Sequence, residues 1–344
     1  MKAFTYLESQ ENLIGLTERD ALFSFDKPTI VRVKGKDSTK AVLISVLLHG
    51  CEPAGFRAFL KEINKGREYS LDIFFLIGNI RSAQIEPIFS SRLVSGRQNY
   101  NRIWVDDSVN TKRELTKDEL IAKEMFDFLK TLPIIAHLDL HSFNAKTTPP
   151  HAIIPNMDEK HLNFSKKLCK ETFVFDIGGG DLISRTAKFG PSCVIECGTN
   201  NSSEADEFAY QTVERFLIEF GLIEGSVDSI RDSKVIFGVT NIKLRPEFSA
   251  SWAKEKQDAD LTLREDVSDL NIKVLSAKTF LGWADSLDVF LVKDKTGMIN
   301  PNEIFILEEG KLYTKMEVVP DLLAPKEWIT KESGFYFFTN IRDA

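Results

Sequence analysis

Three residues at the ends of two apolar runs have the types and the spacing of a metal site. The run VLISVLL is followed by His49, with Glu52 three positions later, and the run IIAHLDL is followed by His141. Two histidines and one carboxylate form a common ligand set for zinc that leaves a fourth position for water. A metal ion held in this way activates water for hydrolysis. The residues predict a hydrolytic metal site, although a polar strand end without a metal would give the same pattern.

His49 and Glu52 can share an ion only if the chain turns into a helix directly after the first apolar run. Residues three positions apart lie on the same side of a helix. The segment 52–65 has apolar residues at helical intervals, and Pro53 stands where the first turn of a helix accepts proline. His141 lies far along the chain, so the fold has to bring it to the other two residues.

Two further charged residues follow apolar runs and could take part in hydrolysis. Glu196 comes after SCVI, and as a general base it could take a proton from metal-bound water and pass it to a leaving amine. An ordinary ion pair at a strand end is the alternative for this residue. Arg81 follows another apolar run, where a fixed cation could stabilise an oxyanion.

Three polar residues have the chemistry to recognise a carboxylate or to support a metal ligand. Asn101 and Arg102 are adjacent in QNYNRIW. A guanidinium offers two parallel donors to a carboxylate and an amide can add a third. Asp139 lies two residues before His141, so both would point to the same face of a strand and could share a hydrogen bond. A polar loop and a buried structural aspartate are the alternatives.

The elements that must position these residues follow the pattern of an α/β sheet covered by helices. Up to about residue 225, short apolar runs alternate with amphipathic segments. The carboxyl ends of strands in such sheets gather the active-site residues. The predicted strands are 30–33, 42–48, 73–77, 134–140, 173–176 and 193–196, and the predicted helices are 52–65, 117–131, 158–170 and 203–220.

The residue pattern of the sequence changes after residue 225. Segments such as VIFGVTNIKL, SLDVFLVKD, EIFILEE and KLYTKMEVV are rich in strand-forming residues and are separated by turns. We therefore expect a catalytic domain over 1–225 and a smaller β-rich domain over 226–344. The charged stretch 254–269 is compatible with a helix or with a loop.

Composition excludes several classes of function. The 344 residues are 43% hydrophobic, and the formal net charge is -7 with a pI of about 5.5. This charge argues against a nucleic-acid-binding surface. The four cysteines form no C-x-x-C pair, which favours a reducing compartment. The sequence shows neither a secretory signal nor an apolar run long enough to span a membrane. We expect a soluble cytoplasmic protein, and the sequence is silent on its oligomeric state.

Five motifs in chain order resemble the succinylglutamate desuccinylase/aspartoacylase family, which belongs with the zinc carboxypeptidases. HGCEP is similar to the family's H-G-N-E-x segment, GNIRSA to N-P-R-A, NYNRIW to D-L-N-R, LDLHS to D-L-H and IECG to I-E-V-G. The resemblance implies a zinc carboxypeptidase-like mixed sheet flanked by helices, with one Zn²⁺ per chain. The site that it implies has His49, Glu52 and His141 on zinc, Glu196 as base and acid, Arg81 near the oxyanion, and Asn101 with Arg102 on a substrate carboxylate.

Two further matches and several departures accompany this resemblance. It implies Arg185 as a second contact for a carboxylate and Tyr313 as a tyrosine that the β-rich domain brings into the site. Cys51 replaces the usual Asn, Ile80 replaces a proline, and residues 99–100 replace an acidic and an aliphatic residue. None of these changes removes a group that does chemistry, but all alter the walls around it.

The loop after His141 and the segment before Asn101 also differ in ways that bear on the pocket. His151 and Lys146 could line the pocket or face solvent, and the segment 84–98 is longer than in simple members of the family. The identity of the acyl group and of the amine therefore stays open, as does the binding of a second metal.

Three functions fit these observations. The motifs favour a zinc-dependent hydrolase that removes the acyl group from a small N-acyl amino acid, with metal-activated water as the nucleophile. A metallocarboxypeptidase acting on peptides is the first alternative. A metal- or ligand-binding protein without catalysis is the second, which the base and the oxyanion residue argue against. The expected partner is a small molecule with a free carboxylate or a short peptide, and neither nucleic acid nor a membrane is expected.

Overall fold

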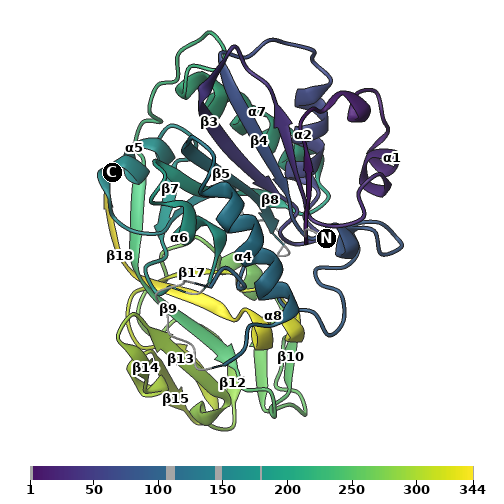
Figure 1. Cartoon of the computed structure of the whole chain (residues 1–344). Helices are drawn as coiled ribbons and strands as arrows, with labels where there is room; N and C mark the ends of the chain where they lie inside the picture. The colour runs from purple at the N-terminus through teal and green to yellow at the C-terminus, as the bar shows by residue number, and fades with distance from the viewer. Residues whose placement is uncertain (1–2, 106–112, 144–148, 179, 344) are drawn as a thin grey trace. The chain divides into compact units, whose positions relative to one another are not determined.

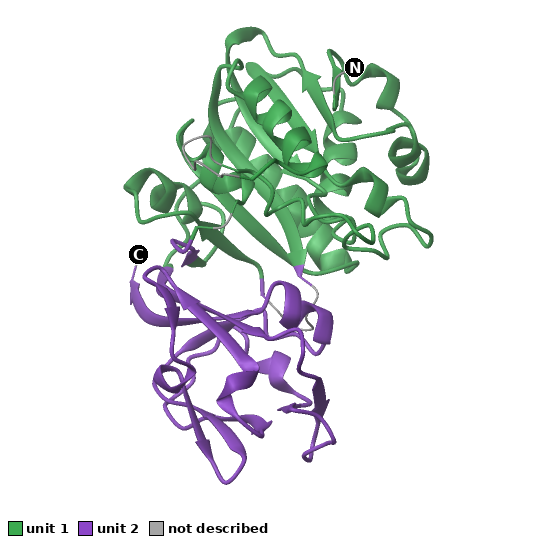
Figure 2. Cartoon of the chain, turned by 60° about the horizontal axis from the view of Figure 1, so that its bottom comes forward, with its two compact units in different colours: residues 1–142, 150–172, 178–233 green, residues 143–149, 173–177, 234–344 purple. Residues whose placement is uncertain are grey.

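The chain consists of two compact units. The computed structural model describes residues 3–105, 113–143, 149–178 and 180–343. The first unit contains residues 1–142, 150–172 and 178–233, and the second contains 143–149, 173–177 and 234–344 (Figure 2). The main division therefore falls after residue 233, and the second unit also takes two short earlier segments. Within the described residues, no helix combines the length and the apolar character needed to cross a membrane.

The first unit is built on a mixed sheet with the strand order β1-β2-β4-β3-β5-β8-β6. β3 pairs in parallel with β4 and with β5, so the carboxyl ends of these three strands meet at one edge. β2 is antiparallel to β4, and β6 is antiparallel to β8. The strands are β1 (Thr5–Leu7), β2 (Thr29–Val33), β3 (Asp37–Val46), β4 (Leu71–Ile77), β5 (Ile134–Phe143), β6 (His151–Ile154) and β8 (Ser192–Thr199), and β7 (Glu171–Val174) is divided between the units.

Helices cover both faces of this sheet, which explains why its strands read as continuous apolar runs. α4 lies on one face of the sheet and α2 on the other (Figure 1). Phe74 of β4 belongs to the cluster that includes Met125 of α4, whereas the ring of the next residue, Phe75, lies 4.8 Å from that of Phe59 on α2. The helices of this unit are α1 (Glu18–Phe23), α2 (Ala54–Ile63), α3 (Ile80–Ala83), α4 (Lys117–Leu129), α5 (Glu159–Ser165), α6 (Leu182–Thr186) and α7 (Ser203–Glu219), with a 3-10 turn at Glu11–Leu13.

The predicted fold class is confirmed, with differences at the ends of the elements. β3 ends at Val46 because the next residue, Leu47, has a φ of 54°, which no strand residue adopts. β5 continues past Leu140, so His141 lies inside the strand and not after it. The helix predicted over 158–170 ends at Ser165. β6 and α6 were not predicted, because each is too short for a periodic pattern.

The second unit contains two sheets around a core of aromatic and aliphatic residues. In one sheet, β9 pairs with β18 and β13, β14 pairs with β13, and β17 pairs with β18; the other has the order β10-β11-β12-β16-β15. The stretch 254–269 is a loop over 254–260, as one of its two alternatives predicted, and it also contains the strand β11, which was not predicted. The elements are β9 (Lys234–Leu244), β10 (Ala250–Ala253), β11 (Leu261–Arg264), β12 (Phe280–Ala284), β13 (Phe290–Asp294), β14 (Gly297–Ile299), β15 (Phe305–Glu308), β16 (Lys311–Thr314), β17 (Val319–Asp321), β18 (Phe335–Asp343) and α8 (Glu327–Glu332), with 3-10 turns at Val267–Leu270, Leu287–Val289 and Pro301–Glu303.

Candidate metal centre

His49, Glu52 and His141 lie together at the carboxyl edge of the first unit's sheet. Their candidate ligand atoms all lie within 4.8 Å of one another, and all three residues are buried. The two carboxylate oxygens of Glu52 face different rings: Oε1 lies 3.0 Å from Nδ1 of His49, and Oε2 lies 2.8 Å from Nδ1 of His141. The fold thus brings the predicted ligand set to one place, and this group could hold a metal ion.

The second nitrogen of each ring is held by an oxygen. Nε2 of His141 lies 3.1 Å from Oδ2 of Asp139, the contact that the alternation of a strand predicts. Nε2 of His49 lies 3.0 Å from Oδ1 of Asn99, which also accepts the backbone N–H of Asn101. An oxygen at Nε2 favours a proton there, and with the proton on Nε2 the lone pair of Nδ1 can bind a metal. Asn99 is a supporting residue that the sequence pattern marked only as a departure.

Close packing of three segments fixes the loop that carries two of the ligands. A side chain at Gly50 would come within 2.5 Å of the backbone nitrogen of Ala83, so only glycine fits between the candidate ligands His49 and Glu52. The N–H of Gly50 donates to the carbonyl of Arg92 at 3.1 Å, and the amide of Asn79 approaches the same carbonyl at 3.4 Å. The segments after β3, after β4 and around residue 92 therefore hold one another in place.

Arg92 is the cation that contacts the ligand group. Its Nη1 donates to Oε1 of Glu52 at 2.6 Å, and its Nη2 lies 2.9 Å from Nε2 of His49. The two neighbours of this Nε2 favour different tautomers: Arg92 favours a proton on Nδ1, and Asn99 favours a proton on Nε2. Nδ1 of His49 faces Oε1 of Glu52, on the side where a metal would bind.

Arg81 is the arginine predicted at the oxyanion, and that role stays a prediction. It is exposed and lines a pocket whose walls include neither His49, Glu52 nor His141. Arg92, in contrast, contacts two of the candidate ligands directly. The sequence signal for Arg92 was weak, since it stands in the irregular segment 84–98 and follows no apolar run.

Glu196 lies on β8, the strand beside β5 in the sheet. It is half-buried and stands opposite His151 in the antiparallel register of β8 and β6, so the two side chains share a face of the sheet. Just beyond β8, the side chain of Asn200 accepts a hydrogen bond from Ser142 and contacts the sulfur of Cys51 at 3.8 Å. The end of β8 is therefore tied to both ligand-bearing segments, and the role of Glu196 as base stays a prediction.

Asn101 and Arg102 differ in their surroundings. Asn101 is buried, and its Oδ1 accepts the backbone N–H of Leu182 at 3.1 Å while its Nδ2 lies 3.5 Å from Nε2 of His141. Arg102 is exposed, and its Nη1 donates to the carbonyl of Asn101 at 2.6 Å. Asn101 therefore anchors this segment beside a ligand, and carboxylate recognition by the pair stays a prediction.

The remaining predicted residues lie on several elements. The guanidinium of Arg185 lies over the ring of Phe126 on α4, 4.6 Å from its centroid. Tyr313 is on β16 of the second unit. His151 is fully buried, so it does not face solvent. Lys146 lies outside the described residues. The substrate contacts predicted for Arg185 and Tyr313 stay predictions.

A buried chain of polar groups extends behind His141. Asp139 uses its Oδ1 to accept the hydroxyl of Ser45, which lies 2.8 Å from Nε2 of His137. Nδ1 of His137 in turn lies 2.6 Å from the hydroxyl of Thr186. A buried polar network is stabilising only when its members satisfy one another. This network holds Asp139 in the orientation that its contact with His141 requires.

The electrostatics of the group suit a bound cation. Burial, followed by the charge of Arg92, lowers the pKa of His49 from 6.5 to about 4. Burial opposes ionisation of Glu52, but His49, Arg92 and His141 together hold the pKa of its carboxyl well below the usual value. Burial also acts to lower the pKa of His141, but Asp139 and Glu52 outweigh this effect and raise it. The carboxylate is therefore ionised, and a metal would displace a proton from His141.

Solved structures share this fold. Matches include succinylglutamate desuccinylase/aspartoacylase from Rhodobacter sphaeroides, with 14% identity over 92% of this chain and 88% of that chain and a TM-score of 0.58. Succinylglutamate desuccinylase from Vibrio parahaemolyticus is 15% identical over 83% of this chain and 89% of its own, with a TM-score of 0.54. Succinylglutamate desuccinylase from Silicibacter sp. TM1040 is 14% identical over 85% of this chain and 82% of its own, with a TM-score of 0.52.

These neighbours carry the name of the family that the five motifs resemble, and at such low identity the likeness establishes the fold. No protein-family model matches the sequence, and no curated protein matches it either. The α/β class with a mixed sheet and flanking helices is thus shared over most of the chain.

Removing the carboxylate of Asp139 should weaken metal binding. We expect Asp139→Asn to lower zinc affinity about 10- to 100-fold, because the hydrogen bond that orients a ligating histidine is lost or weakened. Competition with a chromophoric chelator measures the affinity. Asp72→Asn is the matched control, since Asp72 is a buried aspartate on β4 that pairs with Arg32. An unchanged zinc affinity in Asp139→Asn would show that Asp139 does not support the metal site.

His137 should make the protein acid-sensitive. Burial lowers its pKa from 6.5 to about 4, so the folded chain keeps this imidazole neutral while the unfolded chain protonates it. Its contribution is fully present above pH 6.5 and is lost as the pH falls towards 4, a change of about 3 kcal/mol. Urea unfolding of wild type and His137→Gln should show their difference in unfolding free energy shrinking over this range. A difference in unfolding free energy that does not change with pH would contradict the lowered pKa of His137.

Proposed function

We propose that this protein is a zinc-dependent amide hydrolase that removes the acyl group from a small N-acyl amino acid. One observation carries the proposal: the Nδ1 atoms of His49 and His141 face the two oxygens of Glu52 in a buried group, and an oxygen lies at the Nε2 of each ring. This donor set fits zinc, whose usual ligands are imidazole nitrogens and carboxylate oxygens. The names of the solved structures that share the fold support the substrate class.

The residues of the chain divide the work of hydrolysis among them. Bound zinc would supply an acidified water and polarise the carbonyl of the substrate. Glu196 takes a proton from the attacking water and returns it to the nitrogen of the leaving amine, so that the amide bond breaks with no net change in protons. Asn101 and Arg102 bind the free carboxylate of the amino acid, as a guanidinium with a neighbouring amide can do.

Arg92 stabilises the negative oxygen that develops when the amide carbonyl is attacked. Its guanidinium already lies within hydrogen-bond distance of Glu52 and His49, so it is the cation placed beside the reacting group. Its backbone carbonyl is held by the loop that carries the ligands, which limits its movement. A fixed charge of this kind acts without reorganisation during the reaction. This role replaces the one predicted for Arg81.

A release assay tests the activity directly. The zinc-loaded protein should release amino acid from N-acetyl or N-succinyl amino acids, and Glu196→Gln should abolish release while keeping its zinc, since no other base is assigned. Chelation should remove activity and added zinc should restore it. Activity on peptides alone would establish a carboxypeptidase instead. Bound zinc with no release from any of these substrates would overturn the proposal.

The two arginines can be separated by parallel substitution. Arg92→Gln should lower kcat about 10²- to 10³-fold, the usual effect of losing one oxyanion contact. Zinc content, measured by atomic absorption, should remain near one per chain, and Arg92→Lys should recover part of the rate. If Arg81→Gln causes the loss and Arg92→Gln does not, the oxyanion role belongs to Arg81, as the sequence predicts, and its assignment to Arg92 is wrong.

A further inference from the structure

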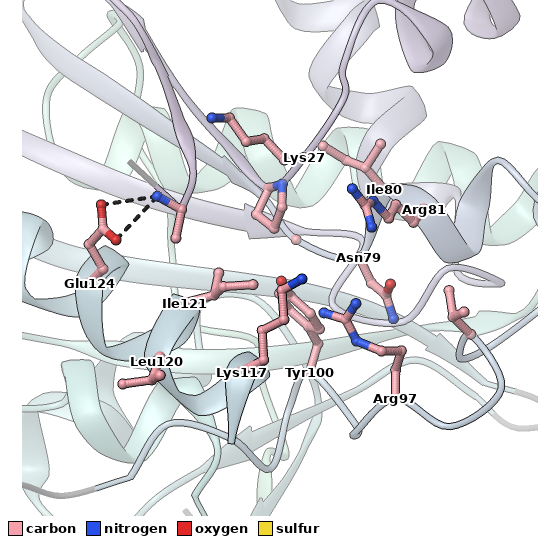
Figure 3. Close-up of a pocket in the computed structure, with 14 residues that line it drawn as sticks. Lys27, Asn79, Ile80, Arg81, Arg97, Tyr100, Lys117, Leu120, Ile121 and Glu124 are labelled. Atoms are coloured by element: carbon pink, nitrogen blue, oxygen red, sulfur yellow. Dashed lines mark hydrogen bonds between the residues drawn. The ribbon is translucent and has the colours of Figure 1, made fainter. Parts of the chain in front are cut away.

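A second pocket lies in the first unit, with walls that include none of the three candidate metal ligands. Its volume is about 280 Å³, close to the lower end of the range for small-ligand sites. The walls come from the segment that follows β4, from the segment before Tyr100 and from the start of α4 (Figure 3). The residues that matter for its chemistry are Asn79, Arg81, Arg97, Tyr100, Lys117 and Ile121.

Positive charge dominates this pocket, although the chain as a whole is acidic. The guanidinium groups of Arg81 and Arg97 and the amine of Lys117 are directed into the space between them, whereas the amine of Lys27 points away (Figure 3). The one acidic residue among the described residues of the walls, Glu124, already accepts the backbone N–H of Ala3 at 3.1 Å. A concave surface lined by one sign of charge concentrates counter-ions of the other sign.

The three cations differ in how much of their charge is already balanced. Nε of Arg97 donates to both oxygens of Asp118 at 2.9 Å, so Arg97 is held in place and partly neutralised. No side-chain hydrogen bond or ion pair engages Arg81 or Lys117 within the described part of the chain, and both are exposed. Two charges without a hydrogen-bonded or ion-paired partner therefore face the pocket beside one that is fixed.

Neutral donors and an apolar wall complete the pocket. The side chain of Asn79 lies beside the two arginines in Figure 3. Tyr100 is buried, and its burial raises the pKa of the hydroxyl, which stays protonated at neutral pH and can donate. Pro28, Leu120 and Ile121 form the apolar part. The combination of clustered cations with an adjoining apolar surface suits a ligand that has a charged end and a carbon skeleton.

We propose that this pocket binds a small organic dianion, either a dicarboxylate or a phosphate monoester, at a site separate from the metal centre. Arg81 and Lys117 neutralise the two charges, Arg97 and Asn79 orient the oxygens, and the carbon skeleton packs on Ile121 and Leu120. Dicarboxylates and phosphate monoesters share the chemistry that these groups recognise. The inference rests on the pocket alone and holds whether or not the proposed hydrolase activity is correct.

Titration calorimetry on the full chain tests the inference, with glutarate and phenyl phosphate as probes and glutaramide as the uncharged comparison. The titrations are done on chelator-treated and zinc-loaded protein, because binding at the metal centre would require zinc whereas binding in this pocket would not. We expect at least one dianion to bind both forms with equal affinity, more weakly as salt is raised, and glutaramide not to bind. The probe that binds more tightly shows whether the ligand is a dicarboxylate or a phosphate monoester.

Substitutions locate the binding. Arg81→Gln and Lys117→Gln should each weaken it at least 10-fold. Lys123→Gln should leave it unchanged, since Lys123 is an exposed lysine on the same helix that does not line the pocket. Lys117→Gln should also retain wild-type turnover in the release assay. The proposal is overturned if neither dianion binds the chelator-treated protein, or if Lys117→Gln binds as the wild type does.

Discussion

The structure of the first unit depends on the burial of one carboxylate between two imidazoles. Glu52 is only 3% exposed, and burying an ionised carboxyl is costly unless opposite charges and hydrogen-bond donors surround it. His49 and His141 each face one of its oxygens, and Arg92 adds a charge-assisted hydrogen bond. Because these partners come from separate segments, the carboxylate can be satisfied only when the sheet and its loops are assembled together.

The parallel pairing of β3 with β5 is what lets these segments meet. Both strands end at the same edge, and the polar groups behind the ligands follow the alternation of the strands: Ser45 on β3 and His137 and Asp139 on β5 connect through short contacts. The network continues to Thr186 on α6. The orientation of His141 is therefore set by residues on a helix and on two strands, none of which is itself a candidate ligand.

The ligands and the strands that carry them could be predicted from the sequence because both leave local signals. Continuous apolar runs mark strands buried on two faces, and His49, Glu52 and His141 stand where such runs end. Arg92 could not be found in this way, since it lies in an irregular segment whose position is fixed by backbone contacts with Gly50. Arg81 has the expected sequence position, but its side chain faces another pocket. The strand β11 was missed because its four residues lie in a stretch dominated by charges.

The absence of a side chain at Gly50 restricts how this protein can diverge. Any larger residue there would collide with the backbone of Ser82 and Ala83, so this position between His49 and Glu52 cannot take a side chain without moving its neighbour. Evolutionary change in what the protein accepts must therefore be absorbed by segments that do not pack against Gly50. The rigid part of the edge would be inherited unaltered, while the variable part would be free to drift.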